Sequence, residues 1–156
     1  MSNSEESKHG EASDEQKYLE YGRKLRAVVA EAIVPWLTSM LEARNGGSLP
    51  TEITEAIDSV AQEALANITE LIEADVDKPL SGPLEQIRRA VSQLGPVLDA
   101  HGFSPPQRDP YDTQMRPEDA HNLGPLSFLD LGEDVQSAGI AWGAAKAHLH
   151  NNRHRQ

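Results

Sequence analysis

Four stretches of the chain carry apolar residues at alternating three- and four-residue steps, and no stretch alternates with a period of two. Steps of three and four place side chains on one face of an α-helix, whereas a period of two is typical of a strand. We therefore predict an all-α fold, a four-helix bundle-like domain. The four apolar faces are predicted to hold Tyr18, Tyr21, Leu25, Val28, Ala32, Trp36 and Met40, then Ile53, Ile57, Val60, Ala64, Ile68 and Leu71, then Leu84, Ile87, Val91, Leu94 and Leu98, and finally Leu131, Val135, Ala138, Trp142, Ala145 and Leu149.

Two prolines lie inside these predicted helices. Proline removes a backbone donor and clashes with the preceding turn, so we expect a kink or break just before Pro35. Gly95–Pro96 predicts a bend in the third helix for the same reason. Trp36 and Trp142 lie on the apolar faces of the first and last helices, and we expect both to be largely buried.

The helix starts also have sequence signals. Ser48 or Thr51 is predicted to cap the second helix, because a hydroxyl can accept a hydrogen bond from a free backbone N–H. Asp130 and Glu133 have the spacing of a capping box and are predicted to open the last helix.

Residues 103–126 contain five prolines and no periodic apolar pattern, and they form a long crossover before the last helix. A structureless connection of this length is usually functional or disordered. Two hypotheses stay open: the segment straps the bundle, or it docks as an arm on a partner protein. Under the second hypothesis the partner-binding side chains are Tyr111, Met115, Leu123, Leu126 and Phe128.

The chain is predicted to form one domain with short tails. Residues 1–13 are polar and mostly uncharged or acidic, so we expect a disordered acidic N-terminal tail. Residues 14–152 are predicted to form a single helical domain, and residues 153–156 a frayed basic end.

The composition excludes several functions. The formal net charge is −11, from 25 acidic residues against 14 lysines and arginines. This balance disfavours general nucleic-acid binding and anionic membrane surfaces. The chain has no cysteine, no apolar stretch long enough to span a bilayer and no apolar signal core in its first twenty residues. We expect a cytoplasmic location.

Four glutamates on the second helix form two ExxE motifs, Glu52–Glu55 and Glu70–Glu73. The pattern superficially resembles the Mg²⁺-binding motifs of the all-α nucleoside-triphosphate pyrophosphatases. In one chain the two motifs lie about 27 Å apart along the same helix and cannot share a metal. A small metal-dependent hydrolase would therefore need an acidic site formed between subunits.

Two histidine patterns have metal-ligand spacing. Glu118 and His121 have the spacing of a di-iron ligand pair, but such a site also needs a second motif of this kind and two further helical glutamates. His150 and His154 are one turn apart and can ligate a divalent metal together if the last helix persists that far. Because the terminal sequence is polar and reads as frayed, we expect no tight transition-metal site and no cofactor.

Gly139, Gly143 and Ala147 leave a strip of the last helix almost without side chains. This spacing lets two helices approach closely, either inside the bundle or at a dimer seam. No nucleophile elbow, phosphate loop or dinucleotide fingerprint occurs in the chain. We therefore predict a non-enzymatic interaction, regulatory or accessory protein that binds another protein and can self-associate.

Overall fold

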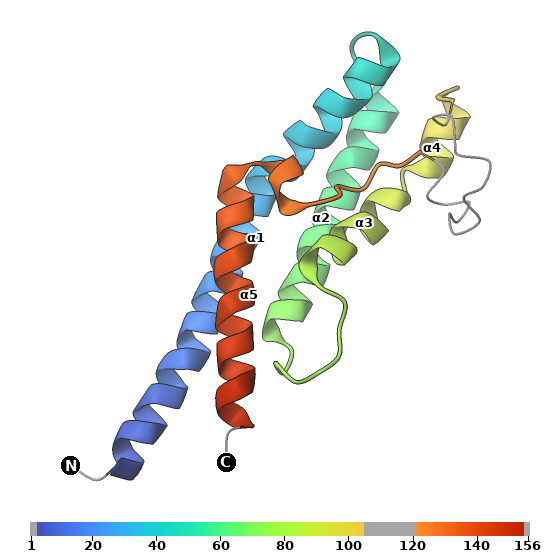
Figure 1. The fold of residues 1–156 in the computed structure, drawn as a ribbon. Coiled ribbons are helices and arrows are strands. Elements are labelled where there is room, and N and C mark those ends of the chain that lie inside the picture. Colours follow the sequence, from blue (N-terminus) through green and yellow to red (C-terminus); the bar gives the residue numbers. More distant parts are fainter. Residues whose placement is uncertain (1–2, 105–120, 155–156) are drawn as a thin grey trace, which may run out of the picture.

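The structure is a computed structural model that describes residues 3–104 and 121–154. Its elements are α1 (Asn3–Asn45), α2 (Thr51–Glu73), α3 (Pro83–Ser92), α4 (Gly95–Ala100), the 3-10 turn η2 (Phe128–Leu131) and α5 (Glu133–Arg153) (Figure 1). No residue of these two ranges lies in a strand, so the all-α prediction is confirmed. None of the helices described is long and apolar enough to cross a membrane.

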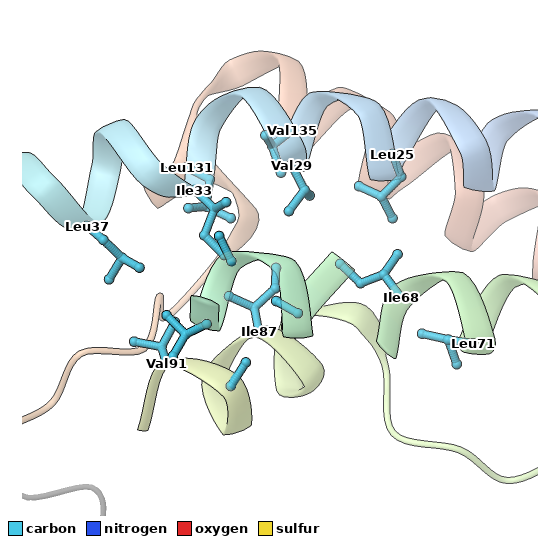
Figure 2. Packing of buried hydrophobic residues seen from close by; sticks show 14 of the residues in the cluster. Leu25, Val29, Ile33, Leu37, Ile68, Leu71, Ile87, Val91, Leu131 and Val135 are labelled. Atoms are coloured by element: carbon cyan, nitrogen blue, oxygen red, sulfur yellow. The ribbon is translucent and has the colours of Figure 1, made fainter. Parts of the chain in front are cut away.

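The long helix α1 organises the packing. It contacts both α2 and α5, and α2 also contacts α3 (Figure 1). The buried side chains form one cluster to which every long helix contributes, and Figure 2 shows residues of α1, α2, α3 and α5 meeting in it. The chain segment after residue 120 runs from the α4 side of the molecule back to the start of α5.

Three of the four predicted apolar faces lie in the core, although Leu84 of the third and Ala145 of the last are only partly buried. All six residues predicted on α2 are buried, and Ile87, Val91, Leu94 and Leu98 are buried in the third segment. On the last segment Leu131, Val135, Ala138, Trp142 and Leu149 are buried. The predicted bend at Gly95–Pro96 is an interruption, since α3 ends at Ser92 and α4 begins at Gly95.

The face predicted for α1 is partly wrong. The buried line contains Val29, Ile33, Leu37 and Leu41, one residue further along than Val28, Ala32, Trp36 and Met40. The latter four are only partly buried, so Trp36 does not have the burial predicted for it. Because α1 packs against helices on two sides, its apolar arc is wide and holds two adjacent lines at the same spacing.

Pro35 does not break the helix, because α1 continues to Asn45. Pro35 and Glu31 are both exposed. The carbonyl that loses its N–H partner to the proline is that of Glu31, and on the solvent side water can satisfy it.

The predicted caps are also corrected. Pro50 occupies the N-cap of α2, and no side-chain cap forms from Ser48 or Thr51. The capping box exists, but it joins Ser127 to Asp130 and opens η2, while Gly132 with φ +130 begins α5. Proline fixes an extended entry into α2, and only glycine adopts the Gly132 backbone without strain.

The helix boundaries differ from those expected at both ends. The structure assigns helix from Asn3, within the tail predicted for residues 1–13. Glutamate, lysine and alanine have high helix propensity, so such a segment can extend an existing helix without an apolar face. At the other end α5 includes Arg153, and His154 is its C-cap.

Candidate functional site

The last turn of α5 meets the loop that follows α2. His150 Nδ1 and His154 Nε2 both contact Oδ1 of Asp77, the second at 3.1 Å. The two imidazole rings lie 4.6 Å apart between centroids. The ligand-type atoms of these three residues lie within 4.8 Å of one another, and no other group of this kind occurs in the described parts of the chain. We call these residues the His–Asp cluster.

An arginine fixes the surroundings of the His–Asp cluster. Arg153 donates to Glu15 Oε1 at 2.7 Å and to the Asp75 carboxylate at 3.2 and 3.3 Å, and its Nη1 lies 4.0 Å from Asp77 Oδ2. On the same end of α5, Asn152 donates to Asp14 at 2.7 Å. These contacts join the end of α5 to α1 and to the loop after α2.

The electrostatics follow from these contacts. Hydrogen bonds from His154 and then His150 hold the pKa of the Asp77 carboxyl below its ordinary value. The hydrogen bond to Glu15 raises the pKa of Arg153, with further support from Asp75. Two imidazoles and a carboxylate are the ligand types that bind zinc and other late first-row divalent metals.

The sequence identified two of the three residues of the His–Asp cluster. His150 and His154 stand one turn apart because the helix persists, which was the condition for a shared metal. Asp77 was missed, because its separation of 73 residues from His150 leaves no local signal. In the sequence it only marks the end of a helix.

The four glutamates of the ExxE motifs do not converge. Glu52, Glu55, Glu70 and Glu73 are exposed along the single helix α2. Oε2 of Glu52 lies 2.9 Å from His101 Nε2, so one of these carboxylates already has a partner. An acidic hydrolase site assembled between subunits stays a prediction that needs a second copy of the chain.

His121 has a structural role. Its Nε2 lies 2.8 Å from Asp99 Oδ1, and Arg44 Nη2 lies 3.2 Å from its Nδ1. Because a guanidinium only donates, Nδ1 must accept, which selects the neutral tautomer with the proton on Nε2. His121 is buried and bound at both nitrogens, so it is unavailable to iron; Glu118 lies outside the described residues.

The end of the predicted loop is fastened to the helices. Arg44 also donates to the Ser104 carbonyl at 2.8 Å, and Arg88 donates to the carbonyls of Pro125 at 2.8 Å and Leu126 at 3.0 Å. Leu123 is buried in the core, whereas Leu126 is 83% exposed. Residues 121–125 therefore strap the helices.

Of the remaining partner-binding candidates, one is described by the structure and two are not. Phe128 packs on α5, because a Cβ on Gly139 would lie 2.6 Å from its ring. Tyr111 and Met115 lie outside the described residues, so the docking-arm hypothesis stays a prediction for them.

The small-residue strip of α5 is covered only at its start. Gly139 lies under Phe128, but Gly143 is exposed with no atom within 4 Å of an added Cβ, and Ala147 is exposed. Ile140, at 65% exposure, and Ala144 lie on the same side of the helix. We call Ile140, Gly143, Ala144 and Ala147 the open face of α5.

A cleft of about 360 Å³ lies between α1 and the start of α5. Its charged lining side chains are the acids Glu31, Glu133 and Asp134, beside apolar residues of α1 and η2. It therefore places negative charge next to one end of the open face of α5.

Comparison of the chain with models of known protein families, with curated proteins and with solved structures finds no match.

Proposed function

We propose that this protein is a non-enzymatic helical interaction protein of the cytoplasm whose open face on α5 receives a helix of another protein. The observation that carries the proposal is the chemistry of this face. Lys146 is the only charged side chain between Val135 and Asn152, in a chain of which 25% of residues are charged. Solvent-facing sides of helices normally carry charged and polar residues.

The small side chains support a helix as the ligand. The side chains of this face are small at Gly143, Ala144 and Ala147. The backbone of a second helix can therefore approach closely and gain dispersion contacts along several turns. Ile140 supplies an apolar anchor at one end. Both Gly143 and Ala147 are exposed, so packing against residues 3–104 and 121–154 does not require small side chains at these positions.

Charge favours a different protein over a second copy. Two copies with a formal net charge of −11 repel each other. Glu133 and Asp134 at the start of α5, and Asp75 and Asp77 beside its end, place acids at both ends of the open face. A partner helix with apolar residues on one side and basic residues near its ends fits this pattern.

The test compares two matched variants in the native host. Gly143→Leu combined with Ala147→Leu fills the open face, and Ala66→Leu places the same side chain at an exposed position of α2. Cross-linking and mass spectrometry of the purified complexes should show a protein attached near α5 for the wild type and for Ala66→Leu. The face variant should lose that protein while keeping its helical circular dichroism.

Two results would contradict the proposal. The first is a cross-linked set that is the same for the face variant and the control. The second is sedimentation equilibrium showing that the open face joins two copies of this chain, because that would replace the different partner by self-association.

A further inference from the structure

We propose that Asp77, His150 and His154 form a binding site for a divalent late first-row metal ion of the zinc class. Among its ligands, the proposal shares only Asp77 with the charge argument for the open face of α5, and its two histidine ligands lie outside that face. The proposal starts from the contacts of Asp77, because the imidazole nitrogens of His150 and His154 both lie against its Oδ1. A metal ion would take the place of the protons that these hydrogen bonds now share.

The framework that carries the ligands is anchored in the core. His150 directly follows Leu149 and Asp77 directly follows Val76, and both of these neighbours are buried. His150 lies in the last turn of α5 and His154 caps it, so their spacing is set by the helix. Zinc binds imidazole nitrogen and carboxylate oxygen at about 2.0–2.2 Å, so the ligand atoms around a tetrahedral ion lie about 3.3–3.6 Å from one another. The ligand atoms of the cluster lie within 4.8 Å of one another, so side-chain rotation can bring them to that spacing.

The electrostatic field favours a cation. The described contacts at the end of α5 bring together the carboxylates of four acids and the guanidinium of Arg153; the acids are Asp14, Glu15, Asp75 and Asp77. Arg153 is itself paired with Glu15 and Asp75, so its charge is locally compensated. These contacts also orient the loop that carries Asp77, in the way that outer-shell groups support metal ligands.

The ligand set selects the metal class. Neutral imidazole suits zinc, cobalt, nickel and copper, whereas magnesium and calcium prefer sites built from oxygen alone. All three ligands are exposed, so water completes the coordination sphere and the affinity is moderate. The bound ion would join the end of α5 to the loop after α2, which are 73 residues apart in sequence.

The experiment uses the untagged full chain, freed of metal by a chelator. Titration with Zn²⁺ by calorimetry should show one ion per chain, and Co²⁺ should give a visible d–d spectrum. Zn²⁺ should raise the melting temperature, because it binds the folded chain more tightly than the unfolded one. Mg²⁺ should give neither the heat nor the thermal shift.

Variants identify the ligands. Asp77→Asn and His154→Ala should each weaken Zn²⁺ binding at least about tenfold, since losing a direct ligand costs no less than losing an outer-shell partner. His148→Ala is the matched control, because His148 lies at the same end of α5 but outside the cluster, with its Nε2 3.5 Å from Asp14 Oδ2. The Zn²⁺ affinity of this variant should equal that of the wild type. His154 is at the exposed end of α5, so its replacement leaves the fold intact.

The proposal is overturned if His154→Ala and Asp77→Asn bind Zn²⁺ as tightly as the wild type, because any bound metal would then lie elsewhere. It is equally overturned if the wild type takes up no more Zn²⁺ than a variant that combines Asp77→Asn with His154→Ala. Neither result depends on whether the open face of α5 binds a partner.

Discussion

Gly22 of α1 faces Ile72 of α2 and Trp142 of α5, and its replacement by alanine tests this packing directly. A Cβ at this position would lie 2.8 and 2.9 Å from Cγ2 and Cγ1 of Ile72, and 3.1 Å from Nε1 of Trp142. Ile72 and Trp142 are both buried. The added methyl group therefore has no space unless one of these side chains moves.

The change in the free energy of unfolding is the difference between the cost of overpacking and the gain in helix propensity. Both γ carbons of Ile72 are approached and a β-branched side chain has few rotamers, so rotation does not relieve the contact. Overpacking a buried site typically costs about 1–3 kcal/mol. Alanine gains about 1 kcal/mol over glycine in helix propensity. We expect Gly22→Ala to lower the free energy of unfolding by about 1 kcal/mol, which lowers the melting temperature by roughly 3 °C.

Gly143→Ala is the matched control, because it makes the same change in a helix where an added Cβ meets nothing within 4 Å. It should raise the free energy of unfolding by up to about 1 kcal/mol. Urea unfolding followed by circular dichroism should therefore separate the two variants by about 2 kcal/mol. Equal stabilities, or a Gly22→Ala protein more stable than Gly143→Ala, would refute the packing of α1 between α2 and α5.

Three further predictions concern burial and pH. Leu123→Ala should cost about 2–5 kcal/mol and the exposed Leu126→Ala less than about 0.5 kcal/mol; equal values from urea unfolding would contradict the strap. Trp142→Ala should cost about 3–5 kcal/mol and the partly buried Trp36→Ala clearly less, which the same assay measures. Burial, and then Asp75, raise the pKa of Tyr18 above its ordinary value of 10.0. Its neutral phenol therefore contributes stability that is complete below pH 10 and is lost as the pH rises through the folded pKa, so unfolding from pH 9 to 11.5 should show a steeper alkaline loss for wild type than for Tyr18→Phe.

Periodicity predicts helices well when only one face of a helix is apolar. On α2 the residues between the predicted positions are mostly polar, so the face from Ile53 to Leu71 was identified correctly. On α1 both Val28 and Val29 are apolar, and the neighbouring turns repeat this pair. The pattern then fixes the helix but not its rotation, because the rotation depends on which helices lie on each side.

Local sequence was a poor guide to the helix ends. Ser127 satisfies a backbone N–H only because the chain turns into η2 before α5 begins, and the Asp130 carboxylate accepts from the backbone of Leu126 and Ser127. The turn is fixed by Phe128 lying on Gly139, which is a contact of tertiary structure. No local signal distinguishes this arrangement from a capping box at Asp130 and Glu133.

In the candidate metal site, too, the sequence showed the local pattern but not the tertiary contact. The helical spacing of His150 and His154 is a local property and was visible in the sequence. Their partner Asp77 is brought to them by the packing of α5 along α1 and by the path of the loop after α2. The arginines that fasten the strap, Arg44 and Arg88, were missed for the same reason, since isolated arginines on helices carry no signal of what they contact.

The two ends of α5 are held differently from its middle. Phe128 covers Gly139 near the start, and Arg153 ties the end to Glu15 and Asp75. Between these points an added Cβ on Gly143 would meet nothing within 4 Å among the residues that the structure describes. A glycine inside a helix costs about 1 kcal/mol relative to alanine. The described part of the fold therefore gives no reason for this glycine, whereas the proposed approach of a partner helix would give one. Under the proposed function, Gly143→Ala should therefore make the isolated chain more stable and weaken the binding of the proposed partner helix.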